Sequence, residues 1–146
     1  EFGLMAPADS ALVQRHPQWV TRRRNGNPIV KEGSQDRVWL NPLHPEVQQF
    51  ILQLLGEVVA NYDVDGIQLD DHFGLPVELG YDAYTVQLYR KEHGGKKPPA
   101  NPRDAAWMRW RASKLTQLMK KVFETVKSRN IHCLVALSPN SQDFAY

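Results

Sequence analysis

The sequence is poor in cysteine and has no long apolar run. Cys133 is its single cysteine, which excludes an internal disulfide and a cysteine-based metal cluster. The neighbours of Cys133 in the stretch 131–137 are mostly apolar, so we expect a buried structural thiol. No run approaches the ~20 apolar residues that cross a bilayer, so we expect no membrane-spanning segment in this chain.

An excess of charge of one sign is also missing. The 18 basic and 16 acidic residues are spread along the chain, and the net charge of +2 provides no global field for a nucleic acid or an anionic membrane. We therefore expect no nucleic-acid partner. The local run Arg22–Arg24, next to Asn25–Pro28, is typical of a solvated loop and less typical of a phosphate site. With 42% hydrophobic residues, the chain should form a packed core.

Apolar residues at three- and four-residue steps predict two long helices, one from Pro45 to about Asn61 and one over 105–129. Each is followed, after a short turn, by a predicted buried strand, at 64–69 and 132–137. Shorter strands are expected at 2–6 and 38–40. The stretches 7–37 and 73–102 are rich in Pro, Gly and polar residues and predict long loops, with helical patches near 10–16 and 82–93.

Every long loop follows a strand, whereas the returns from helix to strand are short. This asymmetry is typical of an α/β fold of the (β/α)8 TIM-barrel type, whose active sites lie on the loops after the strands. A doubly wound sheet has the same order, but no phosphate-binding Gly-x-Gly-x-x-Gly follows any predicted strand. A closed barrel needs ~250 residues. We therefore interpret residues 1–146 as a single fragment of a barrel domain, which should self-associate or require the rest of its barrel.

Three polar residues, Asp70, Asp71 and His72, directly follow the predicted strand 64–69. Strand alternation places Gln68 and Asp70 on the same face, toward the barrel lumen, so Asp70 is the first candidate catalytic carboxylate and Gln68 a candidate substrate ligand. The alternative is that Asp70 only caps the next segment or pairs with an arginine.

The roles of Asp71 and His72 remain open at this stage. Asp71 either takes part in catalysis or points to the helix layer and supports Asp70, while His72 should return to the lumen and bind substrate. Consecutive ligands without a distant partner are a weak metal signal, so we expect no metal and no other cofactor.

Other polar or aromatic residues near predicted strand ends are further candidates for binding a sugar: Glu1, Trp39, Asn41, His44, Ser138 and Asn140. Each has a structural alternative. Trp39 is equally compatible with the core, Asn41 with the start of a helix, and Asn140 with a turn.

Several segments resemble the bacterial glycosyl-hydrolase-like family 10 domain, and the resemblance covers essentially the whole chain: 1–7, 16–19, 39–42, 62–73 and 138–140. The core of 62–73 is also similar to the fourth-strand Gly-x-Arg-apolar-Asp signature of the α-amylase-type glycoside hydrolases. That similarity implies that Asp70 is the nucleophile. Gln68 stands where those enzymes have the arginine that supports it.

The resemblance implies a glycoside hydrolase acting on a polysaccharide or oligosaccharide, exported or associated with the cell envelope, with this chain forming roughly strands three to five. The α-amylase-type acid/base glutamate has no counterpart in 136–139, which leaves the acid to Asp71 or to residues beyond Tyr146. Two alternatives stay open. One is a non-catalytic carbohydrate-binding barrel, and the other is a metal-dependent hydrolase built on Asp70 and His72.

Overall fold

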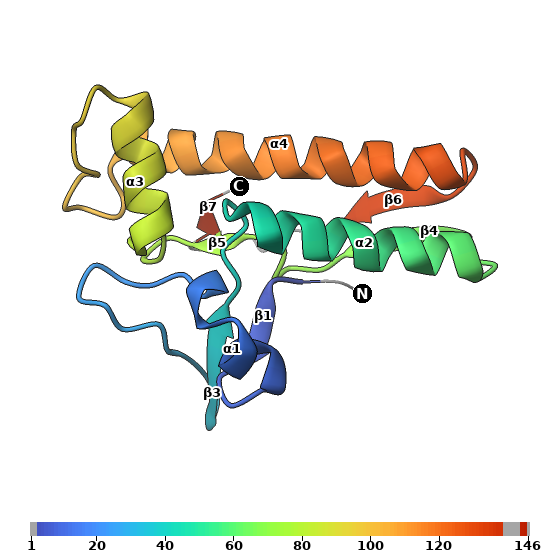
Figure 1. Ribbon diagram of the computed structural model, residues 1–146, viewed down its shortest axis with the longest axis horizontal. Helices are drawn as coiled ribbons and strands as arrows, with labels where there is room; N and C mark the ends of the chain where they lie inside the picture. Colours follow the sequence, from blue (N-terminus) through green and yellow to red (C-terminus); the bar gives the residue numbers. More distant parts are fainter. Residues whose placement is uncertain (1–2, 139–143, 146) are drawn as a thin grey trace.

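The computed structural model of the protein describes residues 3–138 and 144–145. Its centre is a parallel pair of strands, β4 (Gly66–Leu69) and β6 (Leu134–Leu137), in which Ile67 lies opposite Val135. Helices α2 (Pro45–Asn61) and α4 (Ala105–Arg129) lie side by side and pack against each other (Figure 1). Because each strand follows a helix after a short turn, the arrangement is two αβ units of the predicted kind.

The two long helices form where the sequence predicts them because each has one continuous apolar face. In α2 the buried residues recur at four-residue steps at Val47, Ile51, Leu55 and Val59, and Pro45 occupies the first turn, where its missing N–H has no partner to lose. In α4 the Asp104 side chain caps the N-terminus. The buried side chains of both helices join those of β4 in one core cluster.

The stretch 7–37 is more ordered than predicted. It contains the short helix α1 (Ala11–Arg15), as expected near 10–16, and a 3-10 turn η1 (Pro17–Trp19). It also contains a hairpin of β2 (Val30–Glu32) and β3 (Gln35–Trp39), and β3 pairs on its other side with β1 (Met5–Pro7), so the sheet order is β1-β3-β2 with antiparallel pairs. In Figure 1 this sheet projects away from the helical layer.

The loop prediction for 30–37 was wrong because the hairpin buries little. Residues 30–36 are half-buried or exposed, so the apolar alternation that marks a strand is absent. The hairpin is instead specified by its tight turn, where Gly33 adopts φ 58°, a left-handed conformation that favours glycine.

The segment after β4 carries the short strand β5 (Leu75–Pro76), which pairs with β7 (Phe144–Ala145). Helix α3 (Ala83–Glu92) then forms within the patch predicted at 82–93, and the Asp82 carboxylate accepts the Thr85 N–H as its N-cap. None of the helices in the described part of the chain is long and apolar enough to cross a membrane.

The two faces of the β4–β6 sheet differ in exposure. Ile67 and Leu69 are buried beneath the helices, whereas Gln68 is exposed on the opposite face, as strand alternation predicts. The prediction that 132–137 is buried was wrong, since Leu134 is 67% exposed and Leu137 42%. Among the described residues, β6 pairs only with β4 and nothing covers the sheet face opposite the helices. Cys133, just before β6, is buried as expected.

Candidate functional site

The polar triplet after β4 forms one compact cluster. His72 donates its backbone N–H to Asp70 Oδ1 at 3.0 Å, and its ring Nδ1 lies 3.4 Å from Asp70 Oδ2 and 3.2 Å from Asp71 Oδ1. All three residues are half-buried. Asp71 does not point to the helix layer, because strand geometry ends at Leu69 and the chain turns there, with the Phe73 N–H donating to Asp70 O at 3.0 Å.

Two other segments approach Asp70 closely. The Leu4 N–H donates to His72 O at 3.0 Å, and a Cβ atom placed on Gly3 would lie only 2.5 Å from Asp70 Oδ1. A glycine is therefore required here for a close approach of backbone to carboxylate. On the other side the Ser138 N–H donates to Leu69 O at 2.9 Å, so the exposed Ser138 stands beside Asp70 at the ends of two adjacent parallel strands.

The hairpin adds two residues that the sequence did not single out. Glu32 Oε1 lies 3.6 Å from His72 Nε2, and Glu32 Oε2 accepts a hydrogen bond from Arg37 Nε at 2.9 Å. Forty positions separate Glu32 from His72. They meet because β2 pairs with β3, β3 pairs with β1, and Leu4, just before β1, donates its N–H to His72 O. Gly33 is the one residue in the sequence that could have indicated a tight turn here. A turn at Gly33 does not by itself predict a contact between Glu32 and His72.

Trp39 and Asn41 lie in the interior rather than on a sugar-binding surface. Trp39 is 3% exposed and packs with its ring centroid 5.9 Å from that of His72, so it supports the site from beneath. Asn41 is fully buried and donates from Nδ2 to Asp82 Oδ1 and to Thr85 Oγ1, both at 2.9 Å. Asp82 Oδ2 also accepts from Thr21 Oγ1 at 2.9 Å. This network joins the loop after η1, the segment before α2 and the start of α3.

His44 lies apart from the triplet. It precedes α2, packs against Tyr84 with ring centroids 4.8 Å apart, and helps to line a groove of about 450 Å³ between the starts of α2 and α3. Gln68 is exposed on the face to which Asp70 was assigned. The remaining candidates, Glu1 and Asn140, lie outside the described residues.

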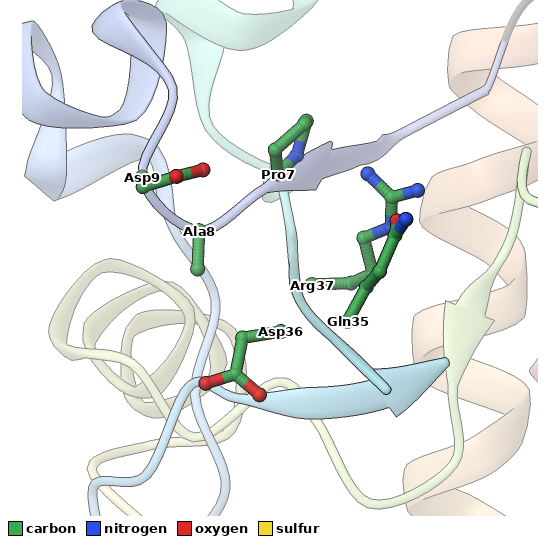
Figure 2. Close-up of a pocket in the computed structure, with 6 residues that line it drawn as sticks. All are labelled: Pro7, Ala8, Asp9, Gln35, Asp36 and Arg37. Carbon is green, nitrogen blue, oxygen red and sulfur yellow. The ribbon is translucent and has the colours of Figure 1, made fainter. Parts of the chain in front are cut away.

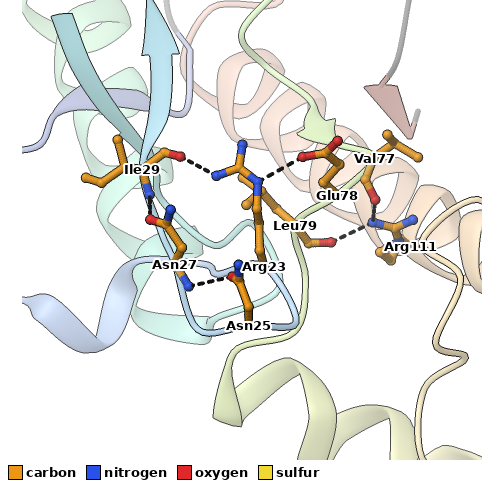
Figure 3. A network of polar contacts seen from close by, with 8 residues as sticks. All are labelled: Arg23, Asn25, Asn27, Ile29, Val77, Glu78, Leu79 and Arg111. Carbon is orange, nitrogen blue, oxygen red and sulfur yellow. Dashed lines mark hydrogen bonds and ion pairs between the residues drawn. The ribbon is translucent and has the colours of Figure 1, made fainter.

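A second set of contacts joins the loop 23–29 to the segment 77–79 and this segment to α4, as Figure 3 shows. Arg23 donates to Ile29 O and, at 2.8 Å, to Glu78 Oε2, so the arginine run ties two loops together rather than being fully solvated. Arg111 of α4 is fully buried and donates to Leu79 O at 2.6 Å and to two other carbonyls, those of Val77 and Pro102. Burial lowers the pKa of its guanidinium to about 10, so Arg111 stays charged at neutral pH.

A pocket of about 620 Å³ lies between the end of β1 and strand β3 and is lined by Pro7, Ala8, Asp9, Gln35, Asp36 and Arg37 (Figure 2). The side chains of Asp36 and Arg37 extend to different sides, as consecutive strand residues do. Asp36 pairs with Lys31 across the hairpin. Since none of the strand-end residues lines this pocket, the cluster around Asp70 remains the candidate active site.

Solved structures with the same architecture identify the fold. An α-galactosidase from Thermus thermophilus, in complex with stachyose, aligns with a TM-score of 0.56 at 18% identity, covering 93% of this chain and 23% of that chain. The glycoside hydrolase domain of PgaB (BpsB) from Bordetella bronchiseptica aligns with a TM-score of 0.64 at 16% identity, covering 82% of this chain and 35% of that one. The fold is therefore that of part of a TIM-barrel glycoside hydrolase, as predicted.

Sequence comparison gives the family. Residues 1–146 match the Glycosyl hydrolase-like 10 family, and the chain belongs to it. The glycosyl hydrolase YngK of Bacillus subtilis is 27% identical over 127 residues, which are 87% of this chain and 21% of that protein. The glycosyl hydrolase DigH of Escherichia coli K12 is 38% identical over 95 residues, 65% of this chain and 20% of that protein. The chain thus spans about a fifth of the length of these curated relatives, and the predicted family resemblance is confirmed.

Proposed function

We propose that the protein containing this chain hydrolyses glycosidic bonds in a polysaccharide or oligosaccharide, with Asp70 as nucleophile or proton donor. The observation that carries the proposal is the position of Asp70, half-buried at the carboxyl end of β4 in a chain of glycosyl-hydrolase-like family and fold. Barrel enzymes place their reacting groups at this end of their strands.

The chemistry requires a carboxyl group that is held in place. The backbone N–H of His72 fixes Asp70 Oδ1, and the packing of Gly3 against the same oxygen limits its movement. A fixed carboxylate is suited to attack an anomeric carbon, or to direct water to it, because less reorganisation is needed in the transition state. Gln68, two positions before Asp70 on β4, and Ser138, just after the adjacent strand β6, are both exposed, which supports a role for them in hydrogen-bonding sugar hydroxyls.

The names of the relatives also support a glycan as the substrate. Two are called glycosyl hydrolases, and one, from Niallia circulans, is called an S-layer-related protein and is 37% identical over 75 residues. We extend the proposal to a polysaccharide of the bacterial cell envelope and to an exported or envelope-associated location.

The experiment compares Asp70→Asn with Asp65→Asn in the complete protein. Asp65 is the matched control, an exposed aspartate at the opposite end of the same strand. Release of reducing ends is measured on a panel of bacterial and plant polysaccharides. Asp70→Asn should lower kcat at least about a thousand-fold, a loss of about 4 kcal/mol in transition-state stabilisation, with glycan binding retained, and Asp65→Asn should keep wild-type activity.

Two results would contradict the proposal. Activity of Asp70→Asn within a few-fold of wild type would remove Asp70 from the chemistry. A wild-type protein that binds glycans in a pull-down but releases no reducing ends from any of them would instead identify a carbohydrate-binding barrel.

A further inference from the structure

We propose that Glu32, carried to the site by the β2–β3 hairpin, is the second carboxyl group of the reaction and protonates the leaving oxygen. This inference rests on the proposed function. The observation behind it is that one imidazole, that of His72, contacts a carboxylate at each of its two nitrogens, Asp70 at Nδ1 and Glu32 at Nε2.

The separation of the two carboxyl groups fits this role. The ring nitrogens of His72 lie 3.4 Å from Asp70 Oδ2 and 3.6 Å from Glu32 Oε1. Across one imidazole ring these contacts hold the two carboxyl oxygens at most roughly 9 Å apart, and the paired carboxyl groups of glycosidases lie about 5 to 9.5 Å apart. The upper limit is compatible with a glycosidic oxygen that lies over the His72 ring, within reach of both carboxyl groups.

Asp71 does not satisfy the same requirement. Its Oδ1 contacts Nδ1 of His72, the nitrogen that also faces Asp70, so Asp71 and Asp70 lie on the same side of the ring. Within the described part of the chain, Glu32 is the carboxylate that contacts the Nε2 side. It is also partly accessible, with 45% of its side chain exposed, as a group that must contact a substrate should be.

Two residues of β3, the central strand of the three-stranded sheet, fix the position of Glu32 and His72. Arg37 of β3 donates from Nε to Glu32 Oε2, which leaves Oε1 directed toward His72, and Trp39 of the same strand packs against the His72 ring. The charged groups that face Glu32 are thus Arg37 and His72. The neighbouring charges of the hairpin, Lys31 and Asp36, pair with each other.

The step balances without a further reactant. Protonated Glu32 gives its Oε1 proton to the glycosidic oxygen while the bond from that oxygen to the anomeric carbon breaks, and the bonding electron pair stays on the oxygen, which leaves as an alcohol. The anomeric carbon gains a new bond to oxygen, either from Asp70 itself or from a water molecule whose proton Asp70 accepts. In both cases one water is consumed overall. The Oε2 atom remains an acceptor for Arg37 throughout.

The test uses the dependence of the rate on the leaving group. Glu32→Gln and the control Asp36→Asn are made in the complete protein, and each is assayed on a glycan that the wild type cleaves and on the 2,4-dinitrophenyl glycoside of the same sugar. Dinitrophenolate leaves without protonation, whereas a sugar alkoxide does not. Glu32→Gln should lose about 10²- to 10⁴-fold on the glycan but less than about ten-fold on the aryl glycoside.

Asp36→Asn should match the wild type on both substrates. If the Gln variant melts at a lower temperature, Glu32→Ala is measured in the same way, and the ratio of the two rates remains the readout, because a misfolded fraction lowers both rates equally. Equal losses on both substrates, or a glycan rate near wild type, would overturn the role of Glu32. If Asp70→Asn is inactive in the same series while Glu32→Gln is not affected as expected, only the role of Glu32 is contradicted, and the proposed hydrolase function stands.

Discussion

At the scale of single residues, His72 organises the candidate site. Its backbone N–H and ring contact Asp70, its ring contacts Asp71 and Glu32, and its carbonyl accepts from Leu4. The sequence identified Asp70, Asp71 and His72 because three polar residues directly after an apolar strand have few structural explanations. It could not identify Glu32, since position 32 sits in a polar stretch with no periodicity.

Burial decided the residues on which the sequence was ambiguous. Asn41 has the polarity of a sugar ligand, but its amide is fully used by Asp82 and Thr85 in the interior. The sequence also does not predict the role of Arg111. It is a charged residue on the apolar face of a predicted helix, and nothing in the pattern indicates that it donates to three backbone carbonyls. Apart from Pro102, which lies nine positions before Arg111, the partners are far away in the sequence, and only the fold supplies them.

The ligand-type atoms of Asp70, Asp71 and His72 lie within 4.8 Å of one another, so a requirement for metal is directly testable. We predict that activity survives removal of divalent ions, because two carboxyl groups are sufficient for glycoside hydrolysis. The complete protein is dialysed against a chelator, its metal content is measured, and reducing-end release should stay within about two-fold of the untreated sample. Loss of activity that zinc or manganese restores would favour a metal-dependent hydrolase instead.

At the scale of elements, helices α3 and α4 begin with the same residue type in different surroundings. The Asp104 cap of α4 accepts the N–H groups of Ala106 and Trp107 near the surface. The Asp82 cap of α3 is 6% exposed and accepts from Thr21 and Asn41 as well as from Thr85. Asp82 is therefore both a helix cap and the centre of a buried network.

We predict that Asp82→Ala destabilises the protein much more than Asp104→Ala. Loss of an ordinary cap costs about 1 kcal/mol, whereas loss of Asp82 also leaves buried donors unsatisfied and should cost roughly 3 kcal/mol or more. The free energy of unfolding in urea, measured for both variants and the wild type, checks the difference. Equal costs would show that the network around Asp82 adds nothing to its capping role.

The elements that the sequence predicted well are those that bury a face. Helices α2, α3 and α4 appear where the periodicity places them, because their apolar stripes pack on the sheet or on each other. The sequence did not predict the hairpin of β2 and β3 because its residues are mostly exposed. The hairpin matters because it brings Glu32 to His72, and it buries little apolar surface.

At the scale of the whole molecule, the described part of the chain leaves an apolar groove of about 460 Å³ between α4 and the end of β6, lined in part by Leu115, Met119, Phe123 and Leu137. Phe123 is 50% exposed and Leu137 42%. Exposed apolar side chains beside an unpaired strand edge favour association.

We therefore predict that residues 1–146, expressed alone, self-associate and show no hydrolase activity. Size-exclusion chromatography with light scattering should give particles of more than one chain. Phe123→Lys, in the groove, should reduce the association, whereas the control Tyr62→Lys, at the end of α2 and outside the groove, should not. A stable monomer with a cooperative melt would show that this chain closes its own core without neighbouring barrel units.

The buried thiol of Cys133 makes local opening of the structure measurable through its rate of alkylation. It is 1% exposed in the turn between α4 and β6, where Lys127 Nζ donates to its carbonyl at 2.7 Å. An alkylating reagent can reach the sulfur only while that turn is open, and no second cysteine in residues 1–146 competes for the reagent. The labelling rate, divided by that of an unhindered thiol, therefore measures how often the start of β6, at the end of the sheet opposite the candidate site, separates from α4, without any introduced probe.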